Sequence, residues 1–524
     1  MSAHLLDFPG IARFLPAMGP LVLLVATLVL HGSRRWASAV FGAALVFNLA
    51  TATLALLRVL IEGSERVVLW APSGYGFDLQ LDALSTTLVL LVAFVGALVG
   101  RFAAVSLAGE RERGRFFADL CLTLAAVSVL LLAGNLLQLA LGWIGASLGL
   151  HRLLTLQGRP EALAGARKKF VVARLGDGCL LTAAGLLIHE LGTPVIAELG
   201  PRAQALEAAG AVSLPLQLAA LLLVAAACFK SALLPTHGWL LDVIEAPTPV
   251  SALLHAGLIN AGGFLIVRLA AVVVTSKVAL TVLLLIGAAT ALFGSLVALT
   301  RTDIKSGLAY STMAQMGFML FQCGLGAFAS AALHIVVHSL YKAHAFLASG
   351  SVVERARARS TSVGAARPVT VTAALGALVL ATGLFVGAGW LLGVSPADKP
   401  GLLPLGAVMV LGLSQLLLRA WSDGLEARTL VLSAAVLTTF VLALSYFGLQ
   451  LGAAAALAEL VPAPRALGPL EIAATVLAVS GFAAAMAVQW LGPEGVGPRW
   501  QRLYVWLHGG LYIDAWLSRR PAGG

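Results

Sequence analysis

The sequence predicts an all-α polytopic membrane protein with about 14 to 15 transmembrane helices, and three observations support this fold class. Of the 524 residues, 60% are hydrophobic and only 11% are charged, whereas a soluble domain is about 25% charged. The apolar residues gather in runs of about 20, the length that an α-helix needs to cross the hydrocarbon core. Lysine and arginine gather in alternate linkers between these runs, as the positive-inside rule expects of a multi-pass protein.

The predicted helices can be placed in chain order from their apolar runs. They lie near residues 11–31, 37–60, 82–105, 116–134, 136–154, 169–191, 214–237, 248–270, 278–300, 303–323, 327–350, 368–392, 401–420, 428–452 and 469–491. The first run has no basic segment before it, so we expect a membrane helix and not a cleaved signal peptide. The remaining polar stretches are linkers, and we expect no sizeable soluble domain.

The charge of the linkers predicts the orientation. By our count about 22 of the 34 basic residues fall on one side of the membrane and about 8 on the other. The richer side holds Arg34, Arg35, Arg111, Arg113, Arg115, Arg159, Arg167, Lys168, Lys169, Arg355, Arg357, Arg359, Arg367, Arg499, Arg502, Arg519 and Arg520. This side should be cytoplasmic, which places the N-terminus outside and, with 15 spans, the C-terminus inside. The net charge of +10 is then a topology signal with affinity for anionic lipid, and we expect no nucleic-acid partner.

Lys230 is the basic residue that most strongly suggests function. It follows an uncharged stretch from Leu221 to Phe229 inside a predicted span. A charged amine in hydrocarbon costs about 3 kcal/mol on insertion scales, so it is read first as a group on an ion or proton path. A lysine shielded from water also holds its proton less tightly, which suits a relay. The alternative is a side chain that reaches the membrane interface and is only structural.

Other charged and imidazole groups share predicted spans. His334, His338 and Lys342 recur every four residues, so they form one stripe on a helix, with Tyr341 and His344 beside it. Imidazole gains and loses protons near neutral pH, so the stripe predicts a chain of proton transfers. A zinc site is the rival interpretation of HxxxH, but no third ligand follows at a suitable spacing. The four cysteines stand apart, without a CxxC or Cys/His cluster, so we expect no metal and no cofactor in this chain.

Arg174 and Asp177 lie three residues apart and share a helix face. They form either a structural ion pair, or a pair in which Asp177 is the counter-ion of Lys230 on a neighbouring helix. Both alternatives remain open from the sequence.

The backbone is interrupted close to Lys230. Pro235, Pro247 and Pro249 separate the seventh and eighth predicted spans, His255 lies one or two turns into the eighth, and three glycines follow within residues 257–263. Backbone groups freed at membrane depth are tolerated only where protein or a water-filled cavity satisfies them. Such broken helices are therefore expected to line a pathway.

These motifs, taken in order, resemble the proton-translocating antiporter-like family, which includes the L-type subunit of respiratory complex I and the Mrp antiporter subunits. The likeness covers most of the first 355 residues. It is carried by residues 77–85 (FDLQLDALS), 135–143, 174–177 (RLGD), 229–239, 247–255 (PTPVSALLH), 302–305 (TDIK), 308–317 (LAYSTMAQMG) and 334–351. The resemblance implies broken helices in an antiporter-like core. It also implies that Lys230 is the central channel lysine and that a hydrophilic axis contains His255, Lys305, His334, His338 and Lys342.

The chain departs from the family pattern at two points. The family has a glutamate after the tryptophan of the fifth span, as partner of the lysine, but here Trp143 is followed by Ile144. The family's lysine in a late broken helix has no match, because Lys399 lies in a Pro/Gly-rich linker. Asp177 is then the candidate for the remaining acid.

Residues 245–247 (EAP) and 256–264 (AGLINAGGF) look more like DabB, the membrane subunit of the Dab-type inorganic-carbon transporters. Few residues follow the last predicted span, so we expect no long lateral helix of the L-type. This resemblance implies a location in a bacterial inner membrane. It also implies a large, peripheral, zinc-containing DabA-like partner that resembles a carbonic anhydrase, with the zinc in the partner.

The first functional hypothesis is therefore a transporter subunit, not an enzyme, in which proton or other cation flow drives handling of CO2 or bicarbonate. The second is a proton-translocating subunit of an NADH-quinone oxidoreductase or an Mrp-type Na⁺/H⁺ antiporter. The third is a non-transporting membrane anchor. We divide the chain into N-terminal helices (1–110), an antiporter-like core with the Lys/His axis (111–355), and C-terminal helices with a short cytoplasmic tail (356–524).

Overall fold

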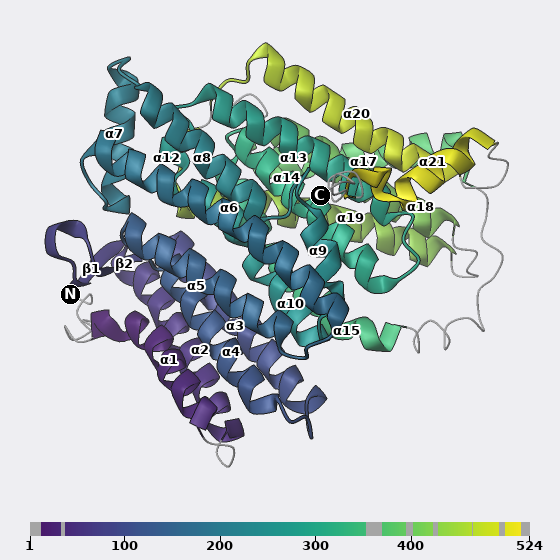
Figure 1. Ribbon diagram of the computed structural model, residues 1–524. Helices are drawn as coiled ribbons and strands as arrows, with labels where there is room; N and C mark the ends of the chain where they lie inside the picture. Colours follow the sequence, from purple (N-terminus) through teal and green to yellow (C-terminus); the bar gives the residue numbers. More distant parts are fainter. Residues whose placement is uncertain are drawn as a thin grey trace, which may run out of the picture.

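The computed structural model describes residues 12–32, 37–352, 369–394, 402–422, 428–463, 465–491 and 498–514. Over these residues the protein is a bundle of long helices with one short β-hairpin, which confirms the predicted all-α membrane fold (Figure 1). Four groups of basic residues from the sequence analysis lie outside the described residues: Arg34 and Arg35, the arginines at 355–367, Lys399, and Arg519 and Arg520.

The first half of the chain folds close to the predicted spans. Its long helices are α1 (Leu15–Gly32), α2 (Ala37–Glu62), α3 (Ala83–Ser106), α4 (Arg113–Leu131), α5 (Leu136–Thr155), α6 (Pro160–Leu191) and α8 (Leu214–Lys230). Polar residues fix where several of them begin: the side chains of Asp82, Asn135 and Ser213 accept hydrogen bonds from the first-turn amides of α3, α5 and α8.

The second half contains broken helices followed by long ones. The elements are α9 (Gly238–Asp242), α10 (Thr248–Ala256), α11 (Ala261–Arg268), α12 (Ala270–Val273), α13 (Lys277–Ala298), α14 (Ile304–Gly324), α15 (Phe328–Ala348), α17 (Val371–Leu391), α18 (Leu402–Ser422), α19 (Arg428–Ala456), α20 (Pro469–Leu491) and α21 (Pro498–His508). In the described part of the chain, 10 segments are long and apolar enough to cross a membrane, counting α10 and α11 as one. Of the other predicted spans, α1 and α8 are shorter, and α5, α14 and α15 carry more polar residues.

Besides the first nine residues of α6 and helix α9, two predicted linkers have structure that the sequence analysis did not anticipate. Residues 65–81 form an antiparallel hairpin of β1 (Glu65–Trp70) and β2 (Phe77–Leu81), in which Val67 pairs with Leu79. The linker after α6 contains α7 (Ile196–Ala208), which buries Ile196, Leu199 and Ala203 on one face. Their spacing of three and four residues is the helical signal that treating this stretch as a polar linker overlooked.

The break near Lys230 is held together by the break in the next span. Helix α8 ends at Lys230, and the Ser231 hydroxyl donates a 2.8 Å hydrogen bond to the Ile259 carbonyl, in the short turn between α10 and α11. A Cβ on Gly262 would lie 2.3 Å from the Ser231 hydroxyl, so glycine permits this close approach. The predicted interruptions therefore form one paired element, and each break satisfies part of the other's freed backbone.

Helices α13 and α14 pack through glycines. A Cβ added to Gly294 would lie 2.7 Å from the Ala314 amide, and one on Gly317 would lie 2.5 Å from the Ala291 amide. Small residues let helix backbones meet closely within a membrane, where apolar burial alone does not drive association.

We expect Gly294→Leu to destabilise the protein by about 1–3 kcal/mol or more, because the new side chain meets backbone that cannot move aside. The change is read as a lower melting temperature of the protein purified in detergent. Gly412→Leu is the matched control, since a Cβ at Gly412 meets no atom within 4 Å. Equal melting temperatures of the two variants would contradict this account of the packing.

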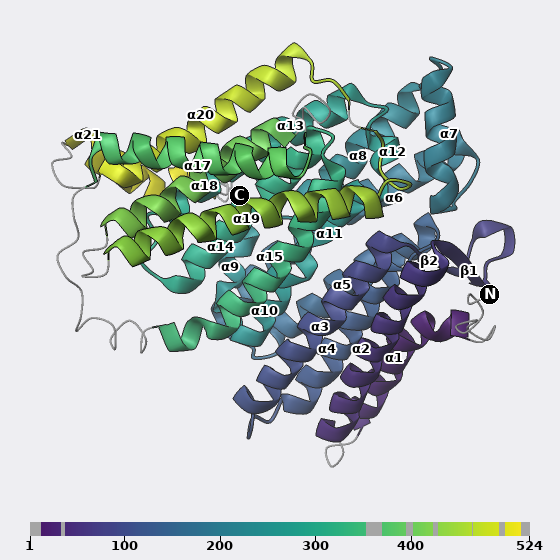
Figure 2. The same cartoon turned by 180° about the vertical axis from the view of Figure 1, so that it is seen from behind.

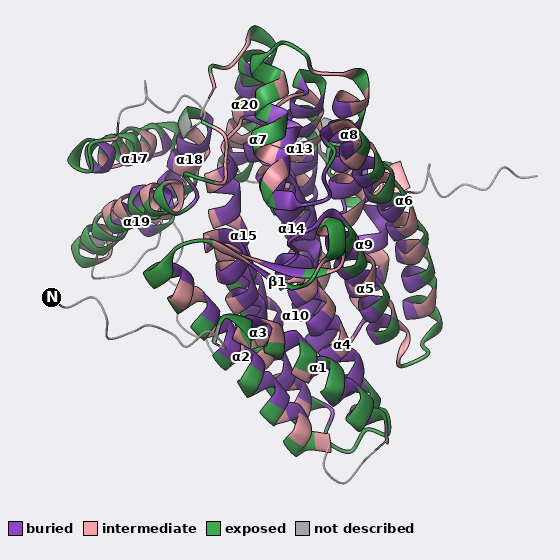
Figure 3. Ribbon diagram, turned by 90° about the vertical axis from the view of Figure 1, so that its left-hand side faces the viewer, coloured by how far each residue is buried: buried purple, intermediate pink, exposed green. Residues whose placement is uncertain are grey.

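Helices α17, α18 and α19 form an apolar cluster separate from the main core. The main core joins residues from Leu23 to Leu457, whereas Ala381, Leu413 and Phe447 belong to the second cluster. Figure 3 shows exposed ribbon on α17 and α19, while α10 is largely buried. In the α10–α11 span 89% of the residues are buried, against 17% in α17. The candidate site therefore lies in a well-shielded part of the molecule.

Candidate functional site

Lys230 is held at the end of α8, where the helix stops inside the bundle. Its amine donates a 3.0 Å hydrogen bond to the Trp143 carbonyl of α5 and lies 4.4 Å from the centre of the Trp143 ring. A carbonyl and an aromatic face stabilise a cation without neutralising it. Ile144, which stands where the family has its glutamate, packs against the hydrophobic core. The partner of the Lys230 amine here is therefore a neutral one.

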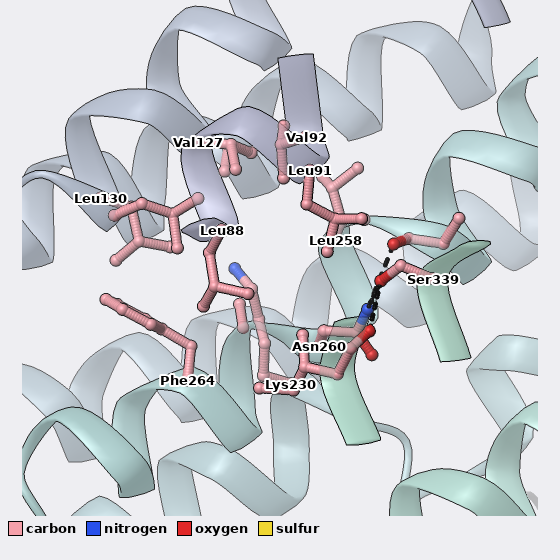
Figure 4. A pocket seen from close by; sticks show the side chains of 16 residues that line it. Leu88, Leu91, Val92, Val127, Leu130, Lys230, Leu258, Asn260, Phe264 and Ser339 are labelled. Carbon is pink, nitrogen blue, oxygen red and sulfur yellow. Dashed lines mark hydrogen bonds between the residues drawn. The ribbon is translucent and has the colours of Figure 1, made fainter. Parts of the chain in front are cut away.

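Two small cavities flank Lys230, each of about 20 Å³, room for about one water molecule. The first is mostly apolar and is closed on one side by Asn260 and Ser339, whose side chains share a 2.8 Å hydrogen bond (Figure 4). Leu88, Leu130 and Phe264 line the rest. Lys230 thus faces a narrow apolar gap, and the nearest polar groups across it come from the α10–α11 break and from α15.

The second cavity contains a lysine that the sequence analysis assigned to a cytoplasmic linker. Lys169 is buried in α6, and its amine donates to the Ser147 carbonyl (2.7 Å) and hydroxyl (3.0 Å) of α5. Lys169 and Lys230 line the same cavity. The signal that could have found it is periodicity, because Lys169 stands two turns before Asp177 and lies on its face of α6.

Asp177 pairs with Arg174 at 2.7 Å, and the arginine also lies over the Phe170 ring. The structure therefore contains the ion pair of the first interpretation. Asp177 is buried and lies close enough to Lys230 and Lys169 for all three charges to interact, although neither lysine bonds to it directly. It is an acid among three basic groups, and this keeps the second interpretation open as a proposal.

The predicted stripe on α15 points partly into the core. His338 is buried, and its Nε2 lies 3.3 Å from the His255 carbonyl; His255 is also buried, with Nδ1 3.0 Å from the Thr312 hydroxyl. The His334 ring is half-buried, with its centre 6.1 Å from that of His338 and its Nδ1 3.1 Å from the Gln322 side-chain oxygen. His255 and His338 thus share one set of polar contacts, and the His334 ring lies next to that of His338.

Lys342 closes this row at the cytoplasmic end that the charge distribution predicts. It is fully buried and donates to the Ser311 hydroxyl (2.9 Å) and the Leu308 carbonyl (3.0 Å) of α14. Tyr341 and His344, which the sequence places beside the stripe, are both exposed. The inward face of α15 therefore carries His338 and Lys342, as the spacing of four predicts.

Lys305 has a different position from the rest of the predicted axis. It lies in the first turn of α14, half-buried, and its amine is 3.2 Å from the Ala246 carbonyl and 3.5 Å from that of Ile244. It therefore ties α14 to the segment between α9 and α10. Pro247 and Pro249 begin α10, and Pro235 is exposed on the loop after α8.

The chemistry available at this site is transfer of protons between neutral and cationic nitrogen groups. Within the described ranges no three His, Cys, Asp or Glu side chains gather closely enough to hold a metal ion. The row offers amines and imidazoles, each with a hydroxyl, carbonyl or amide oxygen within hydrogen-bond distance. These groups can pass a proton in short steps, with water bridging the gaps.

Comparisons with known proteins agree with this architecture. Residues 133–391 match the membrane domain shared by NADH:quinone oxidoreductase and Mrp antiporters. The chain is 37% identical over 499 residues to a protein described as probable inorganic carbon transporter subunit DabB2 of Halothiobacillus neapolitanus, covering 93% of this chain and 87% of that one. It is 42% identical over 280 residues to NADH-quinone oxidoreductase subunit L of Escherichia coli, covering 53% of this chain and 45% of that one.

A solved structure of the Mrp complex from Dietzia sp. DQ12-45-1b shows the same fold. It aligns with a TM-score of 0.57 and 24% identity over 98% of this chain and 57% of that one. Together with the relative matched over nearly its whole length, this shows that the chain is a membrane subunit of a transporter-like complex. It belongs to the antiporter-like family of membrane subunits that includes the inorganic-carbon transporter subunits named DabB and subunit L of NADH-quinone oxidoreductases.

Proposed function

We propose that this chain is the membrane subunit of an energy-coupled inorganic-carbon transporter in a bacterial inner membrane. In this proposal, protons pass along the buried Lys/His row and drive CO2 hydration, or bicarbonate accumulation, by a large peripheral partner. The partner is a zinc-containing subunit that resembles a carbonic anhydrase, and it supplies the hydration chemistry. The single observation that carries the proposal is the shielded row of basic groups within a chain that matches a DabB protein over 93% of its length.

The row divides into two groups. On one side of the apolar cavity, Lys169 and Lys230 line a common space near Asp177. On the other, His255, His338 and Lys342 form contacts between α10, α14 and α15. A proton crosses from one group to the other only when water fills the apolar gap near Asn260 and Ser339. Hydrophobic constrictions gate conduction in this way, by being dry at rest and wet when active.

A small charge imbalance suits this function. Asp177 and Arg174 neutralise each other to first order, so Lys169 and Lys230 remain as two nearby amines with neutral partners. Two positive charges in one shielded space repel each other, so the second of the two amines holds its proton weakly. The pair of amines can therefore gain or lose one proton readily. This property allows a relay to work without the glutamate that Ile144 replaces.

The second candidate is a proton-translocating subunit of a respiratory or Mrp-type complex, favoured by the 42% identity to subunit L over 280 residues. That likeness covers about half of either chain, whereas the likeness to DabB2 covers most of both. Copurification with NADH-oxidising subunits would support this second candidate.

The test is growth of bacteria that lack carbonic anhydrase in ambient air. We expect the chain, expressed with a candidate large partner subunit, to restore growth, and Lys230→Ala to abolish the rescue. Lys277→Ala is the matched control, because Lys277 is an exposed lysine at the start of α13.

Three outcomes separate the hypotheses. Failure of the native pair to rescue growth, with both proteins present in the membrane, contradicts the inorganic-carbon function. Rescue that survives both Lys230→Ala and Lys342→Ala points to a membrane anchor that conducts nothing. Rescue lost only in these two variants supports conduction along the row.

A further inference from the structure

The stripe on α15 continues beyond the histidines to a cavity at the end of the helix. Ser330, His334, His338 and Lys342 follow one another at a spacing of four, so they lie along one side of α15. At 1.5 Å per residue the stripe extends about 18 Å along the axis, more than half of the hydrocarbon thickness. Its Ser330 end lies away from the arginine-rich linker after α15, on the side that the charge distribution predicts to be extracytoplasmic.

The cavity at this end has a volume of about 350 Å³, far larger than the two beside Lys230. It is a partly open cavity lined by the turn between α14 and α15, the C-terminal end of α19, and the segment that follows α19. Figure 2 shows α19 lying across α15, and the two helices are in contact. Ser330, Gln450 and Arg465 provide polar groups in its wall, and Arg465 is paired with Glu471 at 3.0 Å.

One buried pair separates this cavity from the histidines. The Ser330 hydroxyl donates a 2.7 Å hydrogen bond to the Gln450 side-chain oxygen, and these residues are only 4% and 7% exposed. Burying an amide within the membrane core costs free energy unless the amide has a hydrogen-bond partner. Beyond the pair, His334 lies one helical turn further along α15 and bonds to Gln322 of α14.

We propose that this cavity is the outer mouth of the proton path, and that the Ser330 hydroxyl, held by the Gln450 side chain, passes protons with the help of water between the cavity and His334. This assignment rests on the proposed conduction along the row, and it specifies where that row meets the outside. The ligand class is the proton and not a metal cation. The stripe of Ser330, His334, His338 and Lys342 offers two imidazoles and one amine and carries no carboxylate, whereas Na⁺ binds best to oxygen ligands.

Accessibility of the cavity is tested with cysteines in a variant whose four native cysteines are replaced by serine or alanine. Ala454 and Ala458 line the cavity, whereas Ala455, next to Ala454 on α19, is exposed but does not line it. The variants are Ala454→Cys, Ala458→Cys and, as the control, Ala455→Cys. We expect a charged, membrane-impermeant thiosulfonate added to intact cells to modify Ala454→Cys about tenfold faster than Ala455→Cys. A thiol facing lipid forms little of the reactive thiolate.

The same modification tests whether the cavity carries protons. In vesicles containing the chain and its large partner, a modified Ala454→Cys should carry about tenfold less proton flux than the unmodified protein, because the attached group fills the mouth. Gln450→Leu should reduce the flux similarly. Gln415→Leu is its control, since Gln415 pairs with Gln489 on the exposed side of α18 and α20.

The outcomes separate this assignment from the function it rests on. The assignment of the cavity as the outer mouth is wrong if the thiol of Ala454→Cys reacts only from the cytoplasmic side, or reacts no faster than that of Ala455→Cys. This conclusion holds whatever proton flux is measured. Full flux after complete modification, or in Gln450→Leu, also overturns the assignment and leaves the proposed function intact. If the unmodified parent protein carries no proton flux, both the proposed function and the assignment of the cavity as the outer mouth are wrong. Flux that requires Na⁺ and is independent of pH overturns the choice of ion.

Discussion

Replacing Lys342 with methionine is expected to abolish proton flux and growth rescue while leaving the protein as stable as the native chain, or more stable. The amine is fully buried, and its partners are the Ser311 hydroxyl and the Leu308 carbonyl. Leu308 also accepts from the Thr312 hydroxyl at 2.9 Å, so its carbonyl keeps a partner in the variant. Methionine has nearly the shape of lysine without its charge. Removing a buried charge that has no counter-ion among the described residues avoids a desolvation cost of several kcal/mol.

The measurement pairs two readouts on one sample: the melting temperature in detergent, and proton uptake by vesicles that contain the chain with its large partner. Lys277→Met removes an exposed lysine and controls for the substitution itself. Lys342→Met should lose transport while its stability stays the same or rises, which distinguishes loss of a conducting group from loss of the fold. Native flux in a variant without this amine would remove Lys342 from the path.

Much of the site could be predicted because its residues repeat locally. The spacing of His334, His338 and Lys342 is a property of one helix, and the break after Lys230 follows from the prolines that come next. Helices with an apolar run of about 20 residues can be located from composition alone. These features need no knowledge of which helices are neighbours.

The features that sequence reasoning missed depend on contacts between distant segments. Lys169 resembles the linker lysine beside it, and only the packing of α6 on α5 shows that its amine is buried against Ser147. The α7 helix and the hairpin are similar cases, since both are stabilised by contacts outside their own sequence. Leu79 of the hairpin pairs with Ala133, and Val195, just before α7, pairs with Asn135.

The family pattern describes only part of this site, because Ile144 stands where the pattern has an acid. The sequence identifies the missing glutamate but does not reveal what takes its place. In the structure the Lys230 amine is held by a carbonyl and an aromatic ring, with Asp177 and Lys169 nearby. Asp177, the acid whose charge acts on Lys230, therefore comes from α6, whereas the family pattern has its acid beside the tryptophan of α5.

Asp82→Ala is expected to give the largest loss of stability of any single substitution considered, about 3–5 kcal/mol, because it leaves a buried arginine without its counter-ion. Asp82 and Arg268 are 186 residues apart and form two hydrogen bonds, of 2.5 Å and 3.0 Å. The Arg268 side chain is 1% exposed, and it also donates to the Ser85 hydroxyl. This pair joins the start of α3 to the end of α11, so it fixes the broken helix that carries Asn260 beside the Lys230 cavity.

The control separates the ion pair from the second role of Asp82, which is to cap α3. Asp303 caps α14 in the same way, accepting from the Ser306 amide at 2.7 Å, but it is exposed and forms no ion pair with any arginine that the structure describes. Asp303→Ala should therefore cost only about 1 kcal/mol, the usual value of a cap. In urea titrations of the detergent-solubilised protein, Asp82→Ala/Arg268→Met should recover most of the difference, because no buried charge then lacks a partner. Equal losses for Asp82→Ala and Asp303→Ala would mean that capping alone explains Asp82, and that the α3–α11 junction is held by packing.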